Sequence, residues 1–259
     1  MAMAAEKAAR ALVRDFGEVE QLQVSRKGPA DFVSTADTKA EKILVRELSK
    51  ARPNFGFLLE EQGEISGVDP MNRWIIDPLD GTTNFLHGLP HFAISIALEY
   101  DKEVIAGVIY DPVRDEMFWS ERGQGTYLND KRLRVSGRDQ LSEGLFATGI
   151  PFMGILEDGG HQLFIRQLEN VMGVTSGVRR WGAASLDLAY VAAGRYDGFW
   201  ENGLNPWDVA AGILMVREAG GQVTDISGRR YELGAANICA SNDAFHKPLR
   251  TLLRDAQAI

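Results

Sequence analysis

The residues best suited to chemistry lie in one short stretch of the chain. The apolar run Trp74–Ile76 predicts a short strand that stops at Asp77 and Pro78. Pro78 disfavours helical geometry at Asp77, so the chain is expected to open into a turn there. Asp80 follows three residues later, directly before a glycine. Two carboxylates at this spacing offer the oxygen ligands that Mg²⁺ prefers in proteins.

The next residues, Gly81-Thr82-Thr83, are typical of a helix start. Free backbone N–H groups at a helix start form an anion site that suits phosphate. The two neighbouring carboxylates would repel a phosphate unless a divalent cation lay between them. A plainer alternative is that Asp80 only caps the helix and Asp77 only makes a turn.

Further acidic residues are found at predicted element ends. Pro206 suits the first position of a helix, and Asp208 falls in its first turn, where the helix dipole favours an anion. A surface acid matched to that dipole is the alternative. Glu60 and Glu61 end a predicted strand, and Asp37 begins a predicted helix; each taken alone is typical of a solvated or helix-start acid.

Composition restricts the function further. The formal charge is −8, from 28 basic and 36 acidic residues, so no broad nucleic-acid or anionic-membrane interface is expected. Cys239 is the only cysteine, which suits a reducing cytoplasm, and with four histidines it supplies few ligands for zinc. Any metal should therefore be a hard cation. The longest apolar run, 92–98, is too short to span a bilayer, and no signal peptide is expected.

Hydrophobic periodicity predicts a mixture of helices and strands. Helices are expected at 3–20, 37–51, 157–172, 183–194, 206–219 and 243–257. Strands are expected at 55–59, 73–76, 196–200, 221–225 and 236–240, with a meander at 92–99, 103–110 and 115–120 and a turn at 123–125. This order favours an α+β or layered α/β fold. No Gly-x-Gly-x-x-Gly turn follows the first strand, which excludes a dinucleotide-binding Rossmann fold.

Taken together, several motifs resemble the inositol monophosphatase family. They are Asp31–Asp37, Glu60–Glu61, Asp77–Asn84, and Pro206–Asp208 followed by Ala210–Gly212. The resemblance covers about residues 8 to 245. It is closest to the bacterial SuhB-type branch, through Leu89–Ala93, Leu186–Tyr190 and Arg217–Gly221.

The resemblance implies a fold and a setting. The expected fold is the layered α-β-α-β-α sandwich of the sugar phosphatases, which include inositol monophosphatases and fructose bisphosphatases. A single domain over 1–259 is expected, with an N-terminal half (about 1–140) and a C-terminal half (about 141–259) that meet at the active site. The resemblance further implies a cytoplasmic homodimer and a magnesium-dependent, lithium-sensitive phosphatase.

The family's metal ligands carry over residue by residue. By resemblance, Asp77 bridges two Mg²⁺ ions. Glu60 and the Leu79 carbonyl complete the first site, and Asp80 and Asp208 complete the second. A third, weaker Mg²⁺ is expected near Glu60.

The family's catalytic and substrate positions carry over in the same way. Thr82 is expected to orient the attacking water with help from Asp37, beside Glu60, while the N–H groups of Gly81 and Thr82 receive the phosphate. Substrate hydroxyls are expected to meet the remaining positions, which are Asp80, Gly182, Ala183, Ala184, Glu201 and Asp208.

Two departures from the family pattern concern the substrate. Leu59 stands where a glycine usually precedes the paired glutamates, and Ala183 stands where Ser or Thr is common. Ser185 is expected to lie too far round the helix to replace the lost hydroxyl, and Asn205 occupies a position that varies. Inositol 1-phosphate or a related small sugar or cyclitol phosphate is the expected substrate. Histidinol phosphate, fructose 1,6-bisphosphate and nucleotide phosphates remain alternatives.

Two other function classes compete. Haloacid dehalogenase-type phosphatases use a nucleophilic aspartate in an Asp-x-Asp pattern, whereas Asp77 and Asp80 are separated by two residues. The SuhB-type resemblance also implies a regulatory role in transcription complexes, but every metal-ligand position is kept here. Arg179 and Arg180 fit a second subunit, a substrate phosphate or a solvated pair equally well.

Overall fold

The computed structural model describes residues 1–16, 24–28, 31–151 and 160–256, with the backbone alone at 24–28 and 31–34. The first half of the chain contributes α1 (Ala2–Phe16), β1 (Val24–Gly28), β2 (Asp31–Ser34), α2 (Thr35–Ala51), β3 (Phe55–Leu59), β4 (Gly63–Ile65), β5 (Asp69–Asp80), α3 (Thr82–Leu86), β6 (Ala93–Tyr100), β7 (Glu103–Asp111), β8 (Glu116–Glu121), β9 (Gly125–Leu128) and β10 (Lys131–Arg132). The second half contributes a short 3₁₀ turn (Leu141–Glu143), β11 (Leu145–Thr148), α4 (Gly160–Met172), β12 (Gly177–Arg179), α5 (Ala184–Ala192), β13 (Gly198–Asn202), α6 (Pro206–Glu218), β14 (Gln222–Thr224), β15 (Asn237–Ser241) and α7 (Asp243–Asp255).

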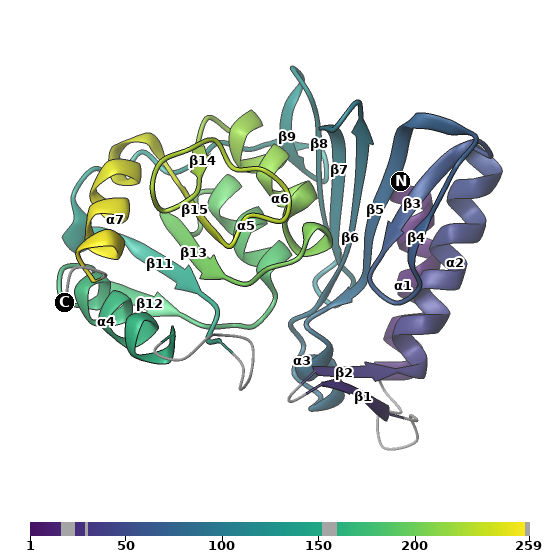
Figure 1. Ribbon diagram of the computed structural model, residues 1–259, viewed down its shortest axis with the longest axis horizontal. Coiled ribbons are helices and arrows are strands. Elements are labelled where there is room, and N and C mark those ends of the chain that lie inside the picture. The colour runs from purple at the N-terminus through teal and green to yellow at the C-terminus, as the bar shows by residue number, and fades with distance from the viewer. Residues whose placement is uncertain (17–23, 29–30, 152–159, 257–259) are drawn as a thin grey trace.

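These elements form five layers (Figure 1). Helices α1 and α2 cover one face of an eight-stranded sheet, whose strand order is β10-β9-β8-β7-β6-β5-β3-β4. Helices α5 and α6 lie between that sheet and a five-stranded sheet of order β12-β11-β13-β15-β14, whose outer face is covered by α4 and α7. The expected α-β-α-β-α sandwich is therefore confirmed. No described helix has the length and apolar character needed to cross a bilayer.

The composition of each helix explains its layer. An outer helix needs only one apolar stripe, and α1 buries Ala4, Ala8 and Leu12 at helical spacing. The central helices must be apolar all round because each faces a sheet on both sides. Every residue of α5 is buried, and so is the continuous stretch 209–216 of α6.

The predicted end of β5 at Asp77 was wrong. The strand continues through Pro78 to Asp80, because a bulge between Asp77 and Asp80 absorbs the proline. Asp77 pairs with Ser95 and Asp80 with Ala93, so two residues of β5 oppose one of β6. A bulge tolerates a residue without an N–H donor and redirects the side chains on either side of it.

Most other predicted elements lie where expected, but several short strands were missed. These are β1, β2, β4, β9, β10, β11 and β12, each of two to five residues. Runs this short are too brief to show a clear alternation, and their pairing partners are distant in sequence. The first helix ends at Phe16 within the described chain, and the predicted helical residues 17–20, 157–159 and 257 lie outside the described residues.

The contact between the two central helices depends on Gly212. A Cβ at this position would lie 2.5 Å from Leu188 Cβ of α5. Helix propensity alone predicts that Gly212→Ala stabilises the protein by about 1 kcal/mol. Because backbone and Cβ atoms cannot move aside cheaply, we instead expect a loss of about 1–3 kcal/mol from overpacking.

Urea unfolding of Gly212→Ala and of the control Gly137→Ala tests this expectation. A Cβ at Gly137 would have no atom within 4 Å, so the free energy of unfolding of Gly137→Ala should differ from that of the parent chain by less than about 0.5 kcal/mol. A Gly212→Ala variant as stable as the parent chain would contradict the packing argument.

Candidate active site

A cavity of about 420 Å³ lies where the edges of both sheets meet the first turns of α3, α5 and α6. Its walls contain five carboxylates and one arginine. The lining residues are Glu60, Asp77, Leu79, Asp80, Gly81, Thr82, Thr83, Gly149, Ile150, Pro151, Arg180, Gly182, Ala183, Ala184, Glu201, Asn202, Gly203, Leu204, Asn205, Trp207 and Asp208. All sequence-predicted site residues lie here except Asp37.

The β5 bulge fixes the two central aspartates. The Leu79 N–H donates to Asp77 Oδ1 at 2.9 Å, which holds that carboxyl across the bulge. Asp80 does not cap α3, contrary to the plainer alternative, because the N-cap position is Gly81 and no side-chain hydrogen bond caps that helix. Asp80 Oδ2 accepts hydrogen bonds from the Ser185 N–H, at 2.7 Å, and from the Ser185 hydroxyl. The first turn of α5 therefore holds this carboxylate in place. Ser185 itself is buried and is not among the residues that line the cavity, so its hydroxyl positions Asp80 and does not take the place of a hydroxyl at Ala183.

Thr82 links the cavity to a deeper carboxylate. Its hydroxyl lies 3.0 Å from both Asp37 Oδ1 and the Leu79 carbonyl oxygen. Asp37 is fully buried in the first turn of α2 and does not line the cavity, but its hydrogen bond with Thr82 connects it to the cavity. Gly81 has φ 93°, a conformation that favours glycine, and a Cβ there would lie 3.0 Å from the His91 carbonyl oxygen.

The second half of the chain supplies the opposite wall. Asp208 accepts the Asn205 N–H at 2.7 Å, so this acid also closes the first turn of α6, but it lines the cavity and is not the surface acid of the alternative. Glu201 projects from β13, and its carboxylate accepts a backbone hydrogen bond from Gly149. A Cβ at Gly149 would lie 1.7 Å from Glu201 Oε1, so a side chain at this position would displace the Glu201 carboxylate.

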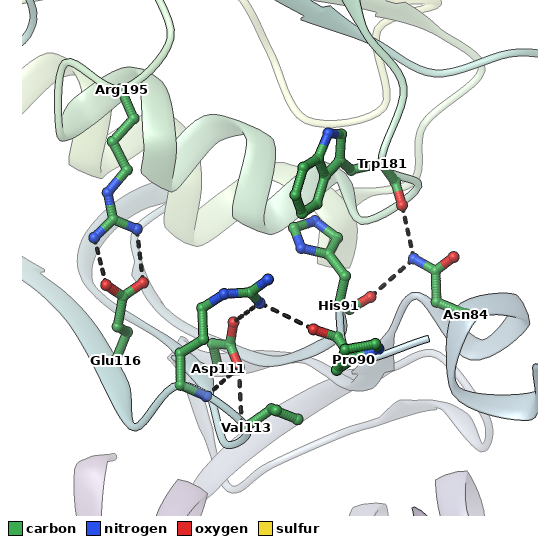
Figure 2. A network of polar contacts seen from close by, with 9 residues as sticks. Asn84, Pro90, His91, Asp111, Val113, Glu116, Trp181 and Arg195 are labelled. Carbon is green, nitrogen blue, oxygen red and sulfur yellow. Dashed lines mark hydrogen bonds and ion pairs between the residues drawn. The ribbon is translucent and has the colours of Figure 1, made fainter. Parts of the chain in front are cut away.

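A buried amide joins the two walls, as Figure 2 shows. The Asn84 side chain donates to the His91 carbonyl at 2.8 Å and to the Trp181 carbonyl at 2.7 Å. Asn84 belongs to α3, next to the bulge, whereas Trp181 directly precedes the Gly182 turn that leads into α5. The amide therefore fixes the distance between the two sides of the cavity.

The carboxylates raise one another's pKa values. Burial and repulsion from Glu60, Asp80 and Asp208 raise the pKa of Asp77 well above its usual value, and its carboxyl shares a hydrogen bond with Glu60. Burial raises the pKa of Asp80 to about 6, with the Ser185 hydrogen bonds opposing the rise.

The acids of the second half behave alike. Burial and then Asp80 raise the pKa of Asp208. The same two causes raise the pKa of Glu201 to about 8, with Arg180 opposing them. Asp187 lies behind this wall, fully enclosed, and its pKa is raised by burial and by Glu201.

This donor set fits a hard divalent cation. The ligands are carboxylate oxygens and a backbone carbonyl, with no thiol or imidazole among the lining residues. As they stand, no three His, Cys, Asp or Glu side chains in the described ranges form a ready cage. Mutual repulsion opposes close approach of the acids, and a cation between them would remove that repulsion.

Sequence reasoning missed part of the cavity wall. Gly149, Ile150 and Pro151 follow β11, a four-residue strand that its pattern did not reveal. Arg180 lines the cavity, which favours a substrate contact over a solvated pair. The glycine before Ile150 and the proline after it were the only available signals of a turn.

Comparison with known proteins identifies the family. The family model described as the inositol monophosphatase family matches residues 1–258. The chain belongs to the inositol monophosphatase family. As a member of it, the protein is a phosphoric monoester hydrolase.

Relatives of this inositol monophosphatase family member carry two kinds of name. An inositol-1-monophosphatase of Mesorhizobium japonicum is 56% identical, over 96% of this chain and 92% of that protein. A Nus factor SuhB of Pseudomonas aeruginosa is 46% identical, over 97% of this chain and 93% of that protein. The crystal structure of the Bartonella henselae extragenic suppressor protein suhB has a TM-score of 0.95 and 58% identity, over 98% and 96% of the two chains.

The raised pKa of Glu201 predicts a pH-dependent stability. A carboxyl group whose pKa is higher in the folded than in the unfolded state costs stability as pH rises between the two values. With chelator present, we expect Glu201→Gln to stabilise the protein at pH 8 but not at pH 4, because glutamine mimics the protonated acid.

Urea unfolding of the parent chain and Glu201→Gln at both pH values is the measurement. Glu143→Gln, a change outside the cavity, is the matched control and should have no pH-dependent effect. Equal effects of Glu201→Gln at pH 4 and pH 8 would contradict the raised pKa.

Proposed function

We propose that the protein hydrolyses inositol 1-phosphate, or a related small sugar or cyclitol phosphate, to the free alcohol and inorganic phosphate in a magnesium-dependent reaction. The observation that carries the proposal is the cavity with five carboxylates and one arginine. Such a cavity repels a phosphate monoester unless cations are bound in it. The inositol-1-monophosphatase of Mesorhizobium japonicum, at 56% identity, supports the choice of substrate.

Within the proposal, the predicted ligands hold two Mg²⁺ ions. Asp77 would serve both; Glu60 and the Leu79 carbonyl would belong to the first, and Asp80 and Asp208 to the second. A third, weaker ion is placed near Glu60. Bound magnesium would lower the pKa of water and neutralise charge that develops on the phosphate and leaving oxygens.

The protein's own groups orient the reactants. The Thr82 hydroxyl, held by Asp37 and the Leu79 carbonyl, leaves an oxygen lone pair to accept a hydrogen bond from the attacking water. The N–H groups of Gly81 and Thr82 are proposed to receive the phosphate. Positioning of this kind supplies much of the catalysis in phosphoryl transfer.

The proposed alcohol side of the substrate faces the second half of the chain. Asp80, Glu201, Asp208 and the 182–184 backbone are proposed to meet its hydroxyls. Ala183 leaves this wall without a side-chain hydroxyl, whereas Arg180 adds a cation that could meet a second phosphate. The choice between cyclitol phosphates and a bisphosphate such as fructose 1,6-bisphosphate is therefore open to experiment.

Phosphate release from a panel of monoesters tests the proposal. The panel contains inositol 1-phosphate, glycerol 2-phosphate, fructose 1,6-bisphosphate, histidinol phosphate and adenosine 3′,5′-bisphosphate, each with magnesium, with chelator and with added lithium. We expect turnover that requires magnesium, falls with lithium and is fastest on inositol 1-phosphate. Equal turnover with chelator would contradict the proposed cofactor, and faster turnover of another ester would change the substrate.

Asp80→Asn tests the metal assignment directly. The substitution keeps the size of the side chain but removes a charged ligand, so we expect kcat to fall at least ~100-fold. Asp139→Asn, an exposed aspartate outside the cavity, is the control and should keep normal turnover. Near-normal rates in a folded Asp80→Asn variant would contradict the two-metal assignment.

Thr82 offers a second test, with a conservative control. Thr82→Val preserves the shape but removes the hydroxyl, and we expect kcat to fall at least ~10-fold with little change in KM. Thr82→Ser restores the hydroxyl and should recover most of the rate. If valine and serine behave alike, the hydroxyl does not orient the reaction.

A regulatory role is a second proposal, because the Pseudomonas aeruginosa relative is named Nus factor SuhB. Such a role predicts binding to the transcription machinery that survives Asp80→Asn. We also propose a homodimer, which light scattering of the purified chain would test.

A further inference from the structure

A second cavity, of about 850 Å³, lies away from the carboxylate site. It is formed by the start of β7, the turn after β8, the last turn of α6 and the segment that follows β14. None of its lining residues lines the first cavity. Its charged side chains differ from those of the first cavity, because four arginines line it; Arg73 is paired with Glu99, and the other three, Arg122, Arg217 and Arg230, come from separate segments.

The three arginines share too little negative charge. Arg230 Nη2 lies 2.6 and 2.7 Å from the two Glu103 carboxylate oxygens, and Arg122 Nη2 lies 3.2 Å from one of them. Arg217 has no ion pair among the described residues; its one side-chain hydrogen bond there is to the Val223 carbonyl, at 3.5 Å. Three guanidinium groups therefore surround one carboxylate.

Other acids in the wall offset most of the positive charge. Glu99 is paired with Arg73 at 2.5 Å, and Glu218 accepts the N–H groups of Gly123 and Gly125 at 2.9 and 3.0 Å. Glu232 also lines the cavity, but Lys102 lines it too, so this pair leaves the excess unchanged. The wall as a whole contains five cationic and four acidic side chains, so one positive charge is in excess.

Further observations support an anion site. Burial and the charge of Arg230 lower the pKa of Arg217, and Arg122 adds to this effect, while the charge of Glu103 opposes it. Tyr231 also lines the cavity; it is buried, and its hydroxyl has no hydrogen-bond partner among the described residues. A basic residue at the C-terminus of α6 is favoured by the helix dipole, but that explains only Arg217.

We propose that this cavity binds a phosphorylated small molecule with at least two oxyanion groups and an apolar body, for which a nucleoside diphosphate is a suitable probe. Guanidinium groups bind phosphate in a bidentate manner, which suits Arg122, Arg217 and Arg230. Apolar side chains from α6 and its neighbours, including Ile213 and Leu233, would contact the organic part. The volume lies within the usual range for small-molecule sites.

Calorimetric titration with ADP in excess EDTA tests the proposal, because the carboxylate cavity then repels the ligand. We expect saturable binding that weakens at least about tenfold in Arg217→Ala and in Arg230→Ala. Arg229→Ala is the matched control: its guanidinium pairs with Asp225 and does not line the cavity, so binding should be unchanged. Asp80→Asn should also bind normally.

Several results would overturn the proposal. They are no binding at millimolar ADP, equal affinity in Arg230→Ala and Arg229→Ala, or loss of binding in Asp80→Asn, which would place ADP in the first cavity. If Arg217→Ala fails to fold, Arg230→Ala still tests the proposal, because the Arg230 side chain is 65% exposed and its removal is expected to leave the fold intact.

Discussion

Repulsion among carboxylates in one cavity is the constraint on which the site depends. Five acids line a volume of about 420 Å³, and burial combined with repulsion from neighbouring acids raises the pKa values of Asp77, Asp80, Glu201 and Asp208. Such an arrangement costs stability unless each acid is held by donors or neutralised. The protein supplies those donors from the backbone: Leu79 to Asp77, Ser185 to Asp80, and Asn205 to Asp208.

The layered fold brings these acids together because they come from both sheets. The bulge in β5 presents Asp77 and Asp80, while β13 and the start of α6 present Glu201 and Asp208. The central helices fix the separation of the two sheets, and the close contact of Gly212 with Leu188 sets how near those helices lie. The packing of the two central helices therefore also sets the distance between the two walls of the cavity.

Sequence reasoning predicted the layered fold and the grouping of the acidic motifs, because helices of this length show clear periodicity and the motifs are specific. It failed where geometry is set by distant partners. A bulge carries β5 through Pro78, and Ser185 reaches Asp80 only because α5 packs at the end of β5. Strand β11, which precedes Gly149, is too short to show a hydrophobic alternation, so the loop beside Glu201 was not predicted. Likewise, residues of the Arg217 cavity are far apart in sequence and carry no common motif.

The central claim is that these carboxylates hold protons until a cation replaces them. Titration calorimetry with magnesium at pH 6, in two buffers of different ionisation enthalpy, measures the protons released on binding. Because metal ligands must be deprotonated, the raised pKa values of Asp77, Asp80 and Asp208 predict net proton release, smaller in Asp80→Asn. Magnesium binding without proton release, or no magnesium binding at all, would contradict the account.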